Sequence, residues 1–260
     1  MAKKKPKIII MSGYGLNCEE ETKFAFDSAG GSADIVHIND LIMEPDRLKE
    51  YQILAFPGGF SYGDDTGSGK AYANKFKNHL SKELAEFLSR DTLVIGICNG
   101  FQIITNLGIL PGGLTYNKGG KYLDRWVDLK VSGSPRHGRA RSPWLTGIDK
   151  LSVPIAHGEG CYIISKKEYG KIKKAGEIAF TYDKGEICNF QNLPANPNGS
   201  NYDIAGVLNY SGRVLGMMPH PERGMFVYQS PLWYKNNKKD KRKWGDGLEI
   251  FKNGVNYFRK

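Results

Sequence analysis

The chain has 260 residues, 40% of them hydrophobic, and a formal net charge of +10. This length can bury one full hydrophobic core, so we expect a single domain over residues 1–260. The apolar runs are only about four or five residues long, which excludes a transmembrane helix, and the start MAKKKPKIIIM lacks the long apolar segment of a signal peptide. We therefore expect a cytoplasmic protein without membrane contacts.

The cysteines and the basic residues exclude two further classes. The four cysteines are spread widely, at Cys18, Cys98, Cys161 and Cys188. They form no Cys-x-x-Cys pair, so the sequence indicates neither a zinc cluster nor another metal site nor a disulfide framework. The lysines lie in separate runs among acidic residues and glycines, without a signature of a nucleic-acid-binding module. We expect no nucleic-acid partner, and an acidic partner protein would use the same charge equally well.

Short apolar strands alternate with helical patterns in the first half of the chain. The strands are expected at residues 7–11, 33–38, 52–56 and 93–97. Their near-continuous apolar character is typical of strands buried on both faces of a parallel sheet. Asn17 can cap a helix that runs to about Ala29, and an apolar i, i+4 stripe over 76–88 predicts a second helix. The pattern is that of a doubly wound α/β fold, a mostly parallel central sheet with helices on both faces.

The C-terminal half predicts a different arrangement of strands. They come closer together, at residues 126–131, 161–164, 177–182, 203–208 and 213–218, with glycine and asparagine turns between them. Residues 209–214 read as a hairpin turn, so we expect an antiparallel extension of the sheet edge. A last amphipathic helix over 245–258 would cover the sheet.

A strand, a sharp turn and a helix meet at Gly96-Ile97-Cys98-Asn99-Gly100. Glycines on both sides of Cys98 let strand and helix pack closely, as in the nucleophile elbow of hydrolases. The partial positive charge of the helix N-terminus would favour a Cys98 thiolate. The alternative is a buried cysteine behind a glycine-rich turn.

The segment Pro219-His220-Pro221-Glu222 supplies a candidate base. The two prolines hold His220 in an extended backbone, in which residues two apart point the same way. The Glu222 carboxylate can then accept a hydrogen bond from one ring nitrogen while the other faces a thiol. The alternative is a rigid surface loop with Glu222 paired to Arg223.

Two glycine-rich turns could supply N–H donors for an oxyanion. The Asn99 amide begins the helix after Cys98, and Gly58 and Gly59 follow a strand at its carboxyl end. A plain turn is the alternative for these two glycines.

Together these residues carry a resemblance to a known family. The segments FPGGFSYGDD, GICNGFQI, PIAHGEG and GMMPHPERG resemble class I glutamine amidotransferases, with a flavodoxin-like sheet. More narrowly, with GLNCEEET near the start, they resemble the glutaminase subunits of phosphoribosylformylglycinamidine synthases. The resemblance runs from about Lys7 to the final helix.

The resemblance implies a role for each matching residue. Cys98 would attack the side-chain amide of glutamine, His220 would move protons, and Glu222 would orient His220. The resemblance assigns the oxyanion donors to the amides of Gly59 and Asn99. It further implies three residues on the glutamine side of the pocket: Gln102, His157 and Glu159.

The resemblance also implies partners. The chain has no P-loop, so no cofactor is expected in it, and ATP and magnesium would bind a larger synthase subunit. That subunit would use the ammonia to convert formylglycinamide ribonucleotide to formylglycinamidine ribonucleotide in purine biosynthesis, and a small bridging subunit is a further candidate partner. The Lys-rich segment YKNNKKDKRKWG is expected to be a surface insertion.

Three other functions fit parts of the sequence. The chain could be the glutaminase of a different synthase, or a stand-alone cysteine hydrolase of the same fold. The turn Gly13-x-Gly15 after the first strand could instead belong to a dinucleotide-binding module, but the third glycine of that motif is missing.

Overall fold

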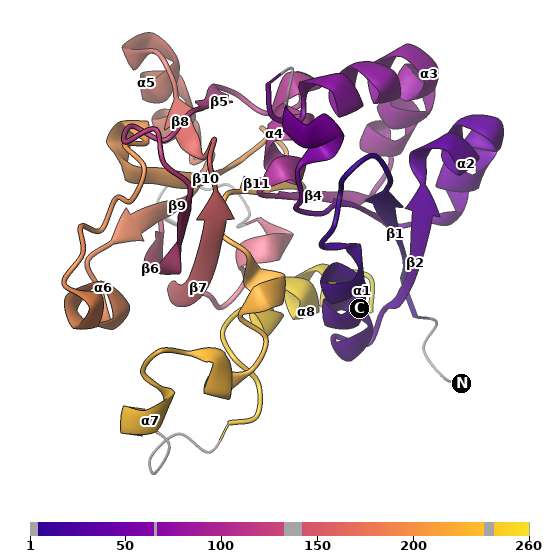
Figure 1. Ribbon diagram of the computed structural model, residues 1–260. Helices are drawn as coiled ribbons and strands as arrows, with labels where there is room; N and C mark the ends of the chain where they lie inside the picture. Colours follow the sequence, from indigo (N-terminus) through magenta and orange to yellow (C-terminus); the bar gives the residue numbers. More distant parts are fainter. Residues whose placement is uncertain (1–4, 65–66, 133–141, 237–241, 260) are drawn as a thin grey trace.

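A nine-stranded mixed sheet runs through the computed structural model, which describes residues 5–64, 67–132, 142–236 and 242–259 (Figure 1). The strand order is β2-β1-β3-β4-β11-β10-β9-β6-β7. The first five are parallel to one another: β2 Ser32–His37, β1 Lys7–Ser12, β3 Ile53–Phe56, β4 Leu93–Ile97 and β11 Val214–Met217. All residues of β3 and β4 are buried, which confirms the prediction from their near-continuous apolar sequences.

Antiparallel strands extend this sheet, as the sequence predicted. They are β10 Ile204–Leu208, β9 Ile178–Asp183, β6 Leu123–Val131 and β7 Lys150–His157. The sequence analysis missed β7, which contains Pro154. A proline is tolerated there because β7 is the edge strand of the sheet.

One predicted strand does not join this sheet. Strand β8, Cys161–Ile163, pairs with β5, Gly113–Thr115, in a separate two-stranded sheet. The expectation that residues 161–164 extend the main sheet was therefore wrong. Periodicity predicts that a short segment is extended, but not which strand it pairs with.

Helices cover both faces of the sheet (Figure 1). Helices α1, Glu19–Ser28, and α8, Leu248–Tyr257, lie on one face, and α3, Lys70–Ser89, and α4, Asn99–Asn106, on the other. The predicted cap of α1 was wrong, because Cys18 and not Asn17 occupies the N-cap. The shorter α-helices are α2 Ile38–Met43, α5 Lys166–Ala175, α6 Glu186–Gln191 and α7 Trp233–Asn236. Single 3-10 turns lie at Pro45–Glu50, Ser61–Asp64, Pro143–Leu145, Asn201–Asp203, Pro221–Arg223 and Val227–Gln229.

The apolar faces of these helices complete the core. In α3 the side chains of Phe76, Leu80 and Leu84 are buried, and in α8 those of Leu248 and Phe251, as the stripes predicted. No helix in the described ranges is long and apolar enough to span a membrane. Residues 237–241 of the Lys-rich segment lie outside the described residues, so its expected role as an insertion stays a prediction. The single domain over 1–260 also stays a prediction.

Candidate active site

Cys98 lies at a strand-turn-helix elbow, as its sequence predicted. It follows β4 directly and is the N-cap of α4, with φ +51° and ψ −108°. Such a backbone is strained for a residue with a side chain and is characteristic of functional turns. The flanking glycines are required by close packing: a Cβ on Gly96 would lie 2.6 Å from the Gly100 oxygen, and one on Gly100 would lie 1.8 Å from the Phe56 oxygen.

The ends of three strands, β4, β11 and β7, meet at Cys98. The Cys98 amide donates to the Met217 oxygen at the end of β11 (2.8 Å), and its Sγ donates to the Ala156 oxygen near the end of β7 (3.6 Å). The side chain is nearly inaccessible, with 4% of the residue exposed. The cysteine therefore lies at the carboxyl edge of the parallel strands, where open α/β sheets place their sites.

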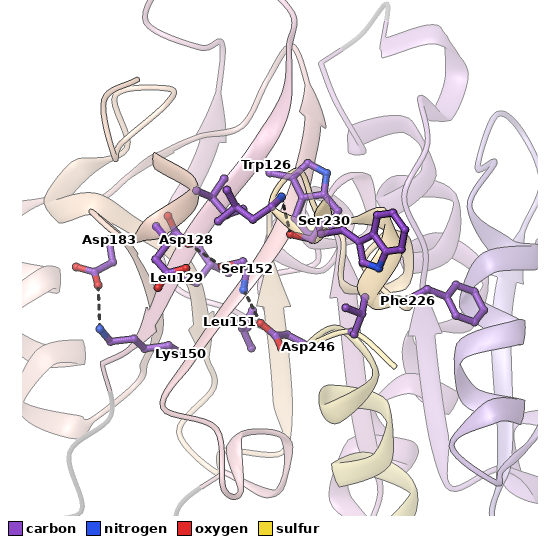
Figure 2. Close-up of a pocket in the computed structure, with 18 of the residues that line it drawn as sticks. Trp126, Asp128, Leu129, Lys150, Leu151, Ser152, Asp183, Phe226, Ser230 and Asp246 are labelled. Carbon is purple, nitrogen blue, oxygen red and sulfur yellow. Dashed lines mark hydrogen bonds and ion pairs between the residues drawn. The ribbon is translucent and has the colours of Figure 1, made fainter. Parts of the chain in front are cut away.

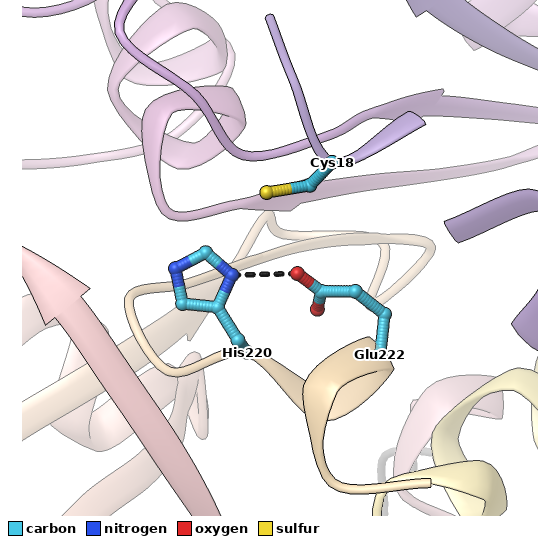
Figure 3. A group of neighbouring side chains, drawn as sticks. All are labelled: Cys18, His220 and Glu222. Atoms are coloured by element: carbon cyan, nitrogen blue, oxygen red, sulfur yellow. Dashed lines mark hydrogen bonds and ion pairs between the residues drawn. The ribbon is translucent and has the colours of Figure 1, made fainter. Parts of the chain in front are cut away.

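His220 and Glu222 form a buried pair immediately after β11. The His220 Nδ1 and a Glu222 oxygen are 2.5 Å apart, and the two side chains point toward each other (Figure 3). The Glu222 carboxylate is thus paired with His220 and not with Arg223, whose guanidinium contacts the sulfur of Cys18. The predicted contact of residues 220 and 222 is confirmed, but the extended backbone predicted for it was wrong, because Pro221–Arg223 form a 3-10 turn that His220 caps. Among the described residues, the His220 Nε2 is buried without a hydrogen-bond partner, so it is available to take a proton from a thiol and to give that proton to a leaving group.

Charges near His220 favour its protonated form. Burial alone lowers the pKa of His220, but the Glu222 carboxylate, followed by the sulfur of Cys98, raises it well above the ordinary value. A histidine that holds a proton beside a cysteine stabilises the thiolate, which is the nucleophilic form of the residue. His220 can therefore act as a proton donor to a leaving group and as the base for a water molecule.

The two predicted oxyanion donors are the backbone N–H groups of Gly59 and Asn99. Leu16 and Gly59 form an isolated antiparallel bridge in which Asn17 N–H donates to the Gly58 oxygen and Phe60 N–H to the Gly15 oxygen. In this type of pair the amides of the two bridged residues point away from each other, so the Gly59 N–H is directed out of the bridge. The Asn99 N–H begins α4 and has no acceptor within the helix. Their role as oxyanion donors stays a prediction.

The residues predicted to line the glutamine pocket are tied to one another. The Asn99 side chain donates to Gln102 Oε1 (2.7 Å), and Gln102 Nε2 donates to the Glu159 backbone oxygen (2.6 Å). The Glu159 carboxylate accepts from the Ser68 amide (3.3 Å). Gln102 therefore links the elbow helix to the loop after β7. A direct contact of these side chains with glutamine stays a prediction.

His157 is part of the wall of the site and not of its proton chemistry. Its Nδ1 is 3.0 Å from the Asn117 side-chain oxygen, and its Nε2 is buried without a partner in the described residues. Burial, and next the charge of His220, lower the pKa of His157 to about 3. The ring is therefore neutral at physiological pH. Its predicted role in substrate binding stays open, and a neutral ring suits that role.

The sequence analysis missed Cys18 as a residue of this site. Its sulfur, one imidazole nitrogen of His220 and one Glu222 oxygen all lie within 4.8 Å of one another (Figure 3). These are metal-ligand types, but a tetrahedral zinc separates its ligands by about 3.4 Å, more than the 2.5 Å between His220 and Glu222. The Arg223 guanidinium, 2.9 Å from the sulfur, also repels a cation. The cluster therefore fits a shared proton better than a metal ion.

The glycines of the Gly13-x-Gly15 turn are explained by contacts within the chain. A Cβ on Gly13 would lie 2.4 Å from the His37 ring, and one on Gly15 would lie 2.5 Å from the Phe60 oxygen. Both glycines also have positive φ, at +104° and +99°. Close packing of this turn against His37 and against the backbone of Phe60 accounts for both glycines without a bound phosphate.

A separate cavity of about 380 Å³ lies away from Cys98. It is bounded by β6, β7 and the segment after β11, with Trp126, Ser152, Phe226 and Asp246 in its wall (Figure 2). Asp246 accepts from the Ser152 amide, and its other oxygen pairs with Arg242. None of the residues predicted for the active site lines this cavity.

We predict that Cys98 is the most reactive of the four thiols. Burial raises the pKa of Cys18 and of Cys161, which keeps them protonated, whereas Cys98 lies at the N-terminus of α4 with its sulfur near the protonated His220 ring. Peptide mapping after limited treatment with iodoacetamide measures the order of labelling. Labelling of Cys18 or Cys161 before Cys98 would contradict the assignment.

Comparisons with known proteins agree with this geometry. A family model described as a CobB/CobQ-like glutamine amidotransferase domain matches residues 5–258. The phosphoribosylformylglycinamidine synthase subunit PurQ of Methanococcus maripaludis is 45% identical over 280 residues, with 100% of each chain covered. The same subunit of Dehalococcoides mccartyi is 41% identical, with 98% of each chain covered.

A solved structure extends the comparison to three dimensions. The structure described as PurLQS from Thermotoga maritima contains a chain with a TM-score of 0.74 and 31% identity, and the match covers 98% of this chain and 99% of that chain. Sequence and fold therefore agree over the full length, and the chain belongs to the PurQ family of glutamine amidotransferases.

Proposed function

We propose that this chain is the glutaminase subunit of a phosphoribosylformylglycinamidine synthase. It hydrolyses glutamine to glutamate and ammonia and delivers the ammonia to a synthase subunit. The observation that carries the proposal is the buried His220–Glu222 pair beside the elbow cysteine Cys98. The full-length identity to PurQ subunits supports the choice of synthase.

The first half of the reaction releases ammonia. The Cys98 sulfur attacks the side-chain amide carbon of glutamine, and the carbonyl oxygen becomes an oxyanion that the N–H groups of Gly59 and Asn99 stabilise. His220 then gives its proton to the leaving nitrogen, the C–N bond breaks, and a thioester on Cys98 remains. Glu222 holds the ring and stabilises its protonated form.

The second half returns the enzyme to its starting state. His220 takes a proton from a water molecule, whose oxygen attacks the thioester carbon. The C–S bond breaks, glutamate leaves, and Cys98 and His220 again share the proton. Each turnover thus consumes one water and forms one glutamate and one ammonia, without an oxidant or a metal in any step.

The later chemistry belongs to other subunits in this proposal. A larger synthase subunit binds ATP and magnesium and uses the ammonia to convert formylglycinamide ribonucleotide to formylglycinamidine ribonucleotide. A small third subunit bridges the synthase subunit and this chain. The match to the structure described as PurLQS from Thermotoga maritima supports an assembly of this kind. The proposed location is the cytoplasm, where a soluble purine pathway would use the product.

We expect the isolated chain to hydrolyse glutamine slowly and to accelerate when the synthase subunit binds with its nucleotide. The Cys98 residue is only 4% exposed and His220 only 1%, so glutamine needs an opening that the free chain populates weakly. A partner that binds the open form better shifts this equilibrium. Glutamate release by the chain alone and by the reconstituted complex measures the effect, expected at about 10-fold or more.

Two results would contradict this proposal. A free chain that works at the full rate of the complex would contradict the coupling to a partner. A complex that uses the acceptor of another glutamine-dependent synthase, and not formylglycinamide ribonucleotide, would show that the chain serves a different synthase. The acceptor panel is needed because the chemistry at Cys98 is the same for all of them.

A further inference from the structure

The start of α1 fixes the orientation of the Gly58–Gly59 peptide. The Gly58 oxygen accepts two hydrogen bonds, from the amides of Asn17 (3.1 Å) and Cys18 (3.2 Å). In a trans peptide the carbonyl of one residue and the N–H of the next point in opposite directions. These two bonds therefore direct the Gly59 N–H away from α1. Gly59 has φ +153°, a conformation that only glycine adopts readily, so the plane is held by these contacts and not by a local preference.

The side chain of the same Cys18 reaches the acid–base pair. Its sulfur is fully buried, lies 2.9 Å from Arg223 Nη2, and interacts with the His220 ring (Figure 3). The side chains of His220 and Cys18 both pack over Gly58, because a Cβ on Gly58 would lie 2.7 Å from His220 Cε1 and 3.0 Å from the Cys18 sulfur. Imidazole, thiol and glycine backbone are thus in direct contact.

We infer that Cys18 is a positioning residue that holds the Gly59 oxyanion donor and the His220–Glu222 pair in register with each other. Its amide orients the Gly58–Gly59 peptide, and its sulfur holds the imidazole side. This inference rests on the proposed function. It differs from a second catalytic thiol, because Cys18 touches the groups that act on the substrate and not the substrate itself.

A thiol suits this position better than a hydroxyl. Burial, the largest effect, raises the pKa of Cys18, so the group is neutral and can accept from Arg223 while its proton points to the Asn17 side-chain oxygen (3.4 Å). The large sulfur also fills the space between Gly58 and Arg223. A serine hydroxyl is smaller and a stronger donor. The Glu222 Oε2, which has no hydrogen-bond partner among the described residues, is a buried acceptor that would attract it.

The test compares Cys18→Ala and Cys18→Ser with Cys188→Ala and Cys188→Ser. Cys188 is a matched control, because it is also buried and its thiol donates to the Leu193 oxygen (2.8 Å), outside the active site. We expect both Cys18 variants to lower the kcat of glutaminase by about 10-fold to 100-fold, with KM within about 2-fold. The Cys188 variants should keep the parent kcat. Thermal unfolding is measured for all four, so that a loss of folded protein is recognised.

A second readout does not need turnover. The rate at which iodoacetamide labels Cys98 depends on the His220 proton, so it should change several-fold in the Cys18 variants and stay at the parent value in the Cys188 variants. Parent kcat and parent labelling rate in both Cys18 variants would overturn the inference, as would equal losses in the Cys188 variants. Inhibition of the parent by Zn²⁺ that the Cys18 variants escape would also overturn it, by assigning a metal site. If the parent lacks glutaminase activity in the reconstituted complex as well, the proposed function fails and not only the role of Cys18.

Discussion

Replacing Cys98 with alanine is expected to abolish glutamine-dependent synthesis by the reconstituted complex and to leave ammonia-dependent synthesis intact. The loss of glutaminase activity should be at least about 10⁴-fold, because no other group on the described residues can form the thioester in the same place. A high concentration of an ammonium salt bypasses the site, since the synthase subunit uses ammonia whatever its source. Product formation with each nitrogen donor measures the two rates separately.

The two donors make each outcome informative. Loss of both activities in Cys98→Ala would indicate structural damage or a direct role of Cys98 in the synthase step. Loss of neither would remove Cys98 from the mechanism. The matched control is Cys188→Ala, a buried cysteine in α6 that should keep both activities. A stand-alone hydrolase would give the synthase nothing that ammonia could replace, so the same assay separates that alternative.

Changes along the His220–Glu222 relay are expected to give graded losses. His220→Ala should lower the glutaminase kcat by about 10⁴-fold, because it removes both the proton donor for the leaving nitrogen and the base for water. Glu222→Gln should cost less, about 10²-fold to 10³-fold. The amide oxygen of the substituted side chain at position 222 can still accept a hydrogen bond from His220 Nδ1, where the parent contact is 2.5 Å. It carries no negative charge to stabilise the protonated ring.

The pH profile distinguishes these roles. The Glu222 carboxylate raises the pKa of His220, so Glu222→Gln should lower the pKa that limits kcat/KM, whereas His220→Ala should remove that limb of the profile. A control for surface charge is Glu249→Gln, whose carboxylate is half exposed and pairs with Lys252 on α8. A Glu222→Gln enzyme as active as the parent would mean that this carboxylate does not serve the histidine.

The elbow and the relay could be predicted from the sequence because both depend on neighbours in the chain. Gly96 is required by its contact with Gly100 inside the same short segment, whereas Gly100 is required by the Phe56 oxygen of the neighbouring strand β3. His220 has an extended backbone and caps the 3-10 turn Pro221–Arg223, and this turn brings the Glu222 carboxylate back to the His220 ring. Neighbouring residues therefore indicate the elbow and the His220–Glu222 pair, while the close approach at Gly100 comes from the packing of α4 on β3.

The strand partners needed the whole structure. Residues 161–163 read as one more strand of the sheet edge, yet they pair with 113–115, and the true edge strand, β7, carries a proline that hid it from a periodicity analysis. An isolated extended segment satisfies its backbone groups equally well against several partners. Burial of the remaining chain selects among these strand partners, and a short stretch of sequence does not contain the information for that selection.

What the sequence by itself determined about this protein is its class of chemistry: an elbow cysteine, a histidine with a carboxylate two residues on, and glycine turns at strand ends. What only the tertiary structure decided is how these parts are held together. Arg223 could have paired with the adjacent Glu222, but it contacts Cys18, a residue 205 positions away. That contact exists because α1 packs against the turn after β11. Neighbouring residues fix local geometry by sterics, whereas contacts over such a separation depend on the packing of elements that the sheet order brings together.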